Sequence, residues 1–232
     1  MKREKFVRKQ IEATDGPIST LSETKHAKMR ESPFVFFRGT APLFYADLAS
    51  GLISLPDPVA RLPRVCVVGD CHVSNFGFLT EEGSHGDTVI FAPNDFDDAC
   101  VGFAGWDILR LMVSMLLTAE HCQGVKSGKY SDPDINRAKS AITLDEAKSA
   151  MQACLTAYTA TCDRVVYRPG EIYEAIDYPP PGKLTKLFEK ARRRAALGEA
   201  FTSKSALAKA VHTVNDKLQF RHLPEKFSRL DP

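Results

Sequence analysis

Two short apolar runs in the first half of the chain are rich in β-branched residues, at 65–68 (Val-Cys-Val-Val) and 88–91 (Thr-Val-Ile-Phe). Such runs are typical of short strands. Polar residues follow each run, so we expect them to lie on loops that a rigid sheet holds in place. The pattern therefore predicts two strands that deliver polar side chains to their ends.

Apolar residues spaced three and four apart predict helices in much of the remaining chain. Between 143 and 163 the spaced residues are Leu144, Ala147, Met151, Cys154, Leu155 and Tyr158. Thr143 and Glu146 supply a capping box at the start of this helix. Further helices are expected at 42–49, from Asp107 to about Ala119 with apolar residues nearly all round, and at 183–197 and 203–218 with basic faces.

These elements divide the chain into a polar arm (1–31), a body (32–222) and a polar tail (223–232). The body opens on an aromatic segment, 32–39, and Pro33 predicts an extended entry to it. A small sheet packed on a mostly helical body is an α+β fold.

Composition limits the classes of partner. The 232 residues are 44% hydrophobic, enough for a substantial core, and the net charge of +2 gives no case for nucleic acid. The six cysteines form no Cys-x-x-Cys pair, which favours reduced thiols in a cytoplasmic protein. The longest apolar run, 108–119, contains Arg110 and falls short of the roughly 20 residues that span a bilayer. We expect neither a membrane nor a nucleic-acid partner.

The polar residues after the two strands have the chemistry of a magnesium-dependent phosphotransferase. Asp70 follows Gly69, where the chain can turn sharply, and would accept the proton of a substrate hydroxyl. Asn75 and Asp95 are oxygen ligands suited to Mg²⁺, and Asp95 is expected to arrive from a neighbouring strand. His72 is expected to brace the loop through a ring nitrogen.

These residues also resemble known families. The segment 69–75 (Gly-Asp-Cys-His-Val-Ser-Asn) resembles the catalytic loop of the aminoglycoside and choline phosphotransferases, a branch of the protein-kinase-like superfamily, and Asp95-Phe96-Asp97 resembles the metal-binding Asp-Phe-Gly of kinases. Four ordered motifs together are similar to the bacterial domain of unknown function 2252 family: they are Ser-Pro-Phe-Val-Phe-Phe-Arg-Gly (32–39), Gly-Asp-Cys-His-Val-Ser-Asn-Phe-Gly (69–77), Asn-Asp-Phe-Asp (94–97) and Trp-Asp-Ile-Leu-Arg-Leu (106–111).

The resemblance implies a protein-kinase-like large lobe over 32–222 that uses Mg²⁺ and ATP on a small hydroxyl acceptor or a protein. It implies that Asp70 is the catalytic residue, with His72 beside it, and that Asn75 and Asp95 are metal ligands. Asp107 is expected as an acceptor for the catalytic-loop backbone, and it is equally explained as a helix cap. Asp97 or Asp98 is a helper ligand for the metal, or both belong to a solvated acidic turn. From its flanking aromatic rings, Arg38 is expected to reach a carboxylate or a phosphate of the cofactor, or to stack as a structural anchor.

One departure from kinases leaves other functions open. The chain has no Gly-x-Gly-x-x-Gly and ends at Pro232 before any nucleotide lobe, so we expect a second chain or a missing segment to supply that lobe. Two alternatives follow: a non-catalytic kinase-like binding module, and a metal-dependent phosphohydrolase with His72, Asp95 and Asp97 as ligands. Asp70 and Asn75 are also ordinary turn residues, and the basic run 190–194 is also explained as a solvated helix face.

Overall fold

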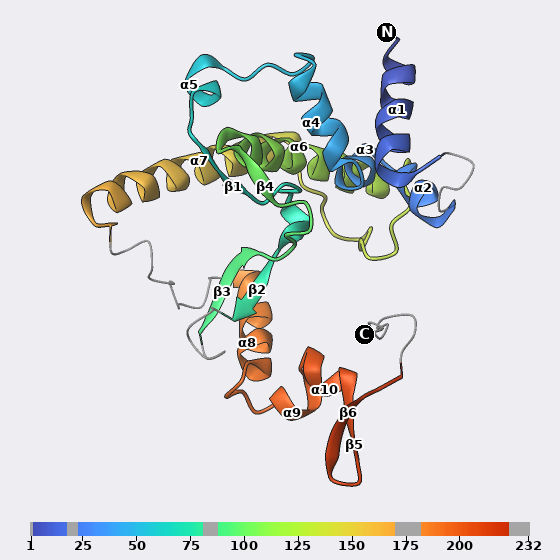
Figure 1. Ribbon diagram of the computed structural model, residues 1–232, viewed down its shortest axis with the longest axis vertical. Coiled ribbons are helices and arrows are strands. Elements are labelled where there is room, and N and C mark those ends of the chain that lie inside the picture. Colours follow the sequence, from blue (N-terminus) through green and yellow to red (C-terminus); the bar gives the residue numbers. More distant parts are fainter. Residues whose placement is uncertain (1, 18–22, 81–87, 170–181, 223–232) are drawn as a thin grey trace. The chain divides into compact units, whose positions relative to one another are not determined.

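The structure is a computed structural model that describes residues 2–17, 23–80, 88–169 and 182–222. The predicted tail, 223–232, lies outside the described residues. The chain forms two compact units, one of residues 1–76 with 93–171 and one of residues 77–92 with 172–232. Helices predominate in both, and the strands form small two-stranded sheets, so the fold mixes helix and strand as predicted (Figure 1).

Seven α-helices are described in the first unit: α1 (Arg3–Asp15), α2 (Glu23–Met29), α3 (Pro33–Arg38), α4 (Ala41–Ala49), α5 (Asp57–Ala60), α6 (Gly105–Ser127) and α7 (Leu144–Tyr167). The predicted capping box of α7 is confirmed, because Thr143 and Glu146 each bond the other's backbone N–H. Ser32 is extended, as predicted, and its hydroxyl accepts from the Val35 N–H at 3.3 Å to begin α3 at Pro33.

Helix α6 is the central element of this unit and packs against α3 and α7. The side chains that it buries include three polar ones, those of Arg110, Ser114 and His121. His121 Nδ1 lies 2.7 Å from the hydroxyl of Ser32, and its Nε2 lies 3.1 Å from the carboxylate of Asp132. These contacts fasten the start of α3 to α6.

The strands of the first unit form one antiparallel pair, β1 (Arg64–Val67) with β4 (Cys100–Phe103). A Cβ at Gly102 of β4 would lie 2.6 Å from the ring of Trp106, so the missing side chain lets that ring pack on the strand. Strand β1 corresponds to the predicted strand at 65–68 and begins one residue earlier. The expectation that Asp95 comes from a strand beside β1 is wrong, because the chain turns after Asp95 and pairs β4 with β1 instead.

The second unit is built on the pair β2 (Phe76–Thr80) and β3 (Val89–Pro93). Strand β3 overlaps the predicted strand at 88–91 from Val89 onward. The helical turn η4 (Gly182–Leu184) leads into α8 (Thr185–Arg194) within the predicted helix 183–197. Phe188 of α8 and Ala195 are buried together with Val89, and Phe78 packs against them. This cluster is the hydrophobic core of the unit.

The single helix predicted at 203–218 is wrong. The chain forms α9 (Phe201–Lys204), α10 (Ala206–Ala210) and an antiparallel hairpin of β5 (Val211–Val214) and β6 (Lys217–Phe220). Asn215 and Asp216 make the turn with φ of 50° and 59°, a left-handed conformation that Asn and Asp tolerate better than most residues. This two-residue turn ends the helical pattern and reverses the chain.

Candidate functional site

The Asp70 loop leaves β1 through Gly69, which has φ of 89°. A Cβ at this position would overlap the backbone carbonyl of Asp98, so only glycine fits here without a shift of the backbone. The close approach places the acidic segment 95–98 directly against the loop. Two motifs that are separate in the sequence therefore form one site.

Side chains from two helices hold the backbone of the loop. At the start of α6, Asp107 accepts hydrogen bonds from the backbone N–H groups of Val68, at 2.7 Å, and Gly69, at 3.2 Å. This confirms the role that the family resemblance implied for Asp107. From α4, the hydroxyl of Tyr45 donates to the carbonyl of Gly69, and burial with the nearby charge of Asp107 raises the pKa of Tyr45. Tyr45 therefore remains a protonated donor.

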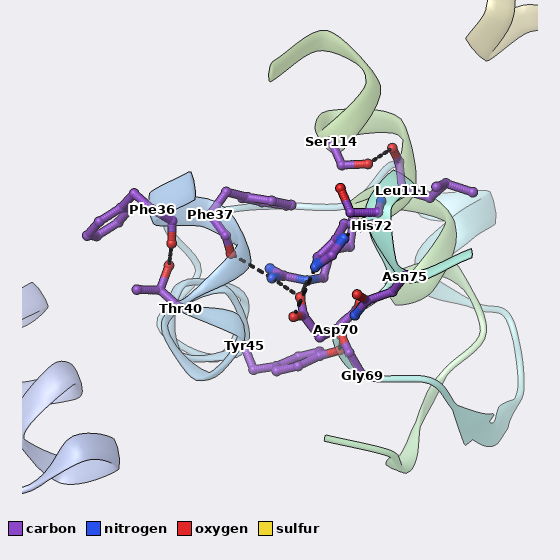
Figure 2. A network of polar contacts seen from close by, with 12 residues as sticks. Phe36, Phe37, Thr40, Tyr45, Gly69, Asp70, His72, Asn75, Leu111 and Ser114 are labelled. Atoms are coloured by element: carbon purple, nitrogen blue, oxygen red, sulfur yellow. Dashed lines mark hydrogen bonds and ion pairs between the residues drawn. The ribbon is translucent and has the colours of Figure 1, made fainter. Parts of the chain in front are cut away.

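Asp70 lies at the centre of a buried network (Figure 2). Its Oδ1 accepts from Arg110 Nε at 2.9 Å and also from Arg110 Nη2, while its Oδ2 lies 3.3 Å from His72 Nε2. Burial alone would raise the pKa of Asp70, but the hydrogen bond with His72 and the charge of Arg110 outweigh it and hold that pKa below its usual value. Asp70 is therefore an ionised carboxylate at neutral pH.

Arg110 has no exposed surface and is fixed by several groups at once. Its Nη2 donates to the carbonyl of Phe37 at 2.7 Å, and its Cζ lies 4.1 Å from the centre of the Phe37 ring and 5.3 Å from that of Phe44. The sequence prediction gave this residue no role, although it interrupts the apolar run 108–119 and stands in the motif 106–111. The available signal was the charge itself, because a cation in the middle of a buried helix needs an anionic partner.

His72 is also buried, and both of its ring nitrogens are engaged within the loop. Nδ1 accepts from the backbone N–H of Ser74 at 3.2 Å, and Nε2 faces Asp70. The next residue, Val73, donates its N–H to the hydroxyl of Ser114 at 3.1 Å. His72 thus braces the loop as predicted, and its catalytic role stays a prediction.

Asn75 lies buried at the end of the same loop. Its side-chain N–H₂ donates to the backbone carbonyl of Asp70 at 3.1 Å, which fixes the orientation of the amide. With the nitrogen engaged, the amide oxygen is the group left for a cation. The backbone N–H of Asn94 donates a second hydrogen bond, to the backbone carbonyl of Asn75 at 3.0 Å. Because Asn94 directly precedes the acidic segment 95–98, this bond connects the segment to the Asp70 loop.

In the acidic segment 95–98, neighbouring carboxylates make the ionisation of Asp95 and Asp98 less favourable. A hydrogen bond with Asp97 and then the charges of Asp97 and Asp70 raise the pKa of Asp95. Burial first, and then the charges of Asp97 and Asp70, raise the pKa of Asp98. A cation bound here would relieve this repulsion.

The acidic segment 95–98 offers carboxylate oxygens as candidate metal ligands. Within the ranges that the structure describes, no three His, Cys, Asp or Glu side chains lie close enough to hold a metal ion. Mg²⁺ usually binds through one or two carboxylates together with substrate phosphates and water. Asp95 and Asp97 lie within hydrogen-bonding reach of each other, and the binding of Mg²⁺ by Asp95, Asp97 and Asn75 stays a prediction.

Arg38 has a different environment from the other predicted site residues. It is exposed on α3, and its Cζ lies 5.8 Å from the centre of the Phe34 ring. Its charge also helps to lower the pKa of Asp132. Of its two sequence interpretations, this contact favours the structural anchor, and binding of a cofactor phosphate stays a prediction.

The four sequence motifs lie within a segment that matches a known protein family. Residues 18–132 match the family described as "Uncharacterized protein conserved in bacteria (DUF2252)". The DUF2252 match includes all four motifs from Ser32 to Leu111, so the predicted resemblance to this family is confirmed over those residues. No curated protein and no solved structure matches the chain.

In the part of the chain that the structure describes, no helix is both long and apolar enough to cross a bilayer.

Proposed function

We propose that the Asp70 loop and the segment 95–98 form the catalytic half of a phosphotransferase that moves a phosphoryl group from ATP to a hydroxyl acceptor with Mg²⁺. The observation that carries this proposal is the contact of the Asp98 carbonyl with Gly69. It brings an ionised carboxylate, an oriented amide and an acidic segment together, and phosphoryl transfer is catalysed mainly by such positioned groups.

Asn75 and Asp95 would hold the metal, with Asp97 as a helper ligand. When bound, Mg²⁺ neutralises charge on the phosphate oxygens of the nucleotide. The hydrogen bond from Asn75 to the Asp70 carbonyl keeps the amide oxygen in one orientation. A hydrogen bond with Asp97 raises the pKa of Asp95, burial raises that of Asp98, and the charges of Asp97 and Asp70 add to both shifts. A bound cation would therefore relieve the repulsion among these carboxylates.

Asp70 would orient the acceptor hydroxyl. Its Oδ1 is occupied by two hydrogen bonds from Arg110, so Oδ2, which it shares with His72, is the oxygen available to a substrate. The low pKa makes Asp70 a weak base. A loose transition state requires little proton abstraction before the phosphoryl group moves, so an orienting carboxylate is sufficient.

The geometry argues against the phosphohydrolase alternative. That function needs His72 as a metal ligand, but its two ring nitrogens already contact Ser74 and Asp70. A metal at either nitrogen would have to break the bracing of the loop. The non-catalytic binding module has no such obstacle, and the absence of a Gly-x-Gly-x-x-Gly from the sequence favours it as the second candidate.

Thermal unfolding tests the proposal. The melting temperature is measured with Mg²⁺ alone, ATP alone and both, for the wild type, Asp95→Asn and the control Asp163→Asn, which changes an exposed carboxylate on α7. Saturation at about 100 times Kd stabilises by about 2.7 kcal/mol. A shift that needs both ligands and is lost only in Asp95→Asn supports the site, whereas equal shifts in all three proteins, or none, overturn it. Transfer to hydroxyl acceptors then separates an enzyme from a binding module.

A further inference from the structure

Charge is unevenly distributed along the chain. Residues 182–222 contain ten Lys and Arg residues and three acidic residues, although the whole chain has a net charge of only +2. The rest of the chain is therefore acidic overall. The small net charge conceals a strongly basic segment, which is the kind of asymmetry that indicates an anionic partner.

Helix α8 arranges part of this charge on one side. Phe188 is buried in the core of the second unit, and Ala191 packs against the same core. Lys186, Lys190 and Arg193 follow one another at spacings of four and three, and all three are exposed. Side chains at these spacings share a helix face. We call this set the basic face of α8, and it points away from the core.

Large aliphatic side chains lie beside these basic residues. Leu187 is 52% exposed and stands three residues before Lys190 on the helix surface. Leu197 is 83% exposed and lines an open hollow of about 500 Å³ at the end of α8 together with Arg192 and Arg193. Two glutamates, Glu189 and Glu199, also line this hollow, and Glu199 forms an ion pair with Arg193, so Lys186 and Lys190 are the main cations of the face. Apolar side chains that gather on a surface and are rimmed by charged ones are typical of sites that bind a partner or a membrane.

The β5–β6 hairpin repeats the combination. Leu218 and Phe220 lie on one side of β6, opposite Thr213 and Val211, and remain 74% and 71% exposed. Lys217 and Arg221 flank them in the sequence. An isolated two-stranded hairpin is marginal in water, and an apolar partner on this side would stabilise it.

We propose that the basic face of α8, with the exposed aliphatic side chains of residues 182–222, binds the surface of a membrane that contains anionic lipids. Lysine and arginine side chains are attracted to anionic headgroups, and aliphatic side chains enter the interfacial region beneath them. Single-stranded nucleic acid is a poorer fit, because its bases need aromatic stacking partners, and Phe220 is the one aromatic residue among the large apolar side chains described as exposed in 182–222. Surface binding requires no spanning helix. It also revises the expectation, drawn from the length of the longest apolar run, that a membrane is not a partner.

Vesicle cosedimentation of the full chain tests this proposal. The wild type is expected to sediment with vesicles of phosphatidylcholine and phosphatidylglycerol at low salt, and to bind vesicles of phosphatidylcholine alone far more weakly. Each basic residue near an anionic surface strengthens binding about fivefold. Lys186→Gln with Lys190→Gln should therefore weaken binding by more than about tenfold. Leu187→Ala should weaken it to a smaller extent, and this loss should persist at high salt.

The matched control is Lys5→Gln with Lys9→Gln, which removes two exposed lysines four residues apart on α1. These changes should leave vesicle binding as it is. Equal binding of the Lys186→Gln/Lys190→Gln variant and the wild type would overturn the proposal, as would equal binding to neutral and anionic vesicles. Binding to single-stranded RNA without binding to vesicles would overturn it in favour of a nucleic-acid partner.

Discussion

The backbone carbonyl of Asp98 packs against the α-carbon of Gly69 so closely that no side chain fits between them. Gly69 also has φ of 89°, which disfavours any other residue. This contact joins the loop that presents Asp70 to the acidic segment that begins at Asp95. The candidate site therefore depends on a backbone contact as much as on its polar side chains.

Gly69→Ala is expected to destabilise the protein through both effects. A left-handed alanine costs about 1–2 kcal/mol, and displacing the Asp98 backbone costs about 1–3 kcal/mol more. Gly51→Ala is the matched control, because Gly51 has φ of 72° but nothing within 4 Å of an added Cβ. Urea unfolding should show the larger loss for Gly69→Ala. Equal losses for the two variants would contradict the close approach.

Arg110→Met is expected to cost about 3–5 kcal/mol of unfolding free energy. The change keeps the length of the side chain but leaves Asp70 buried without its cationic partner. Arg110→Lys should restore only part of the loss, because lysine lacks the planar fork that reaches Asp70 through two nitrogens and also bonds Phe37.

A double mutant separates the ion pair from the packing around it. Combining Arg110→Met with Asp70→Asn should cost less than the sum of the two single changes, because neither charge is then left unpaired. Additive losses in chemical unfolding would mean that Arg110 acts through its contacts with Phe37 and Phe44 alone.

Asp70 should also make stability depend on pH. Its pKa is lower in the folded protein than in the unfolded chain, where Asp titrates near about 3.9. The stabilisation that Asp70 contributes is therefore complete above its pKa in the unfolded chain. It is lost as the pH falls through its lower pKa in the folded protein. The difference in unfolding free energy between the wild type and Asp70→Asn should be constant from neutral pH to about pH 5 and shrink below about pH 4. A difference that does not change in acid would contradict the assignment.

The sequence predicted what depends on neighbouring residues. Helix α7 combines regular apolar spacing with a capping box formed by residues three apart, and the structure has both. The role of Asp107 came from a motif resemblance and is confirmed by two hydrogen bonds. Such features are encoded locally or by a recognisable order of residues.

Other features depend on contacts that no local pattern records. The Asp70–Arg110 pair joins residues 40 apart in the sequence, and its geometry exists only once α6 lies behind the loop. The pairing of β1 with β4 likewise depends on the turn that follows Asp95. The β5–β6 hairpin was missed for a different reason, because the helical spacing of 203–210 was extended past the Asn215–Asp216 turn.

The effect of Asp95→Asn on stability should change sign when ligand is present. Without ligand, Asp97 and Asp70 raise the pKa of Asp95, so its ionised form is disfavoured in the folded state. Removing that charge should leave the protein as stable or more stable at neutral pH, and the gain should vanish as pH falls and Asp95 becomes protonated. With Mg²⁺ and ATP, the wild type should be the more stable protein, because the same carboxylate would then hold the metal. Melting curves of both proteins with and without the two ligands check this crossing. Destabilisation by Asp95→Asn in the absence of ligand would show that the carboxylate serves the fold, since a binding site held at a cost to stability gives the opposite sign.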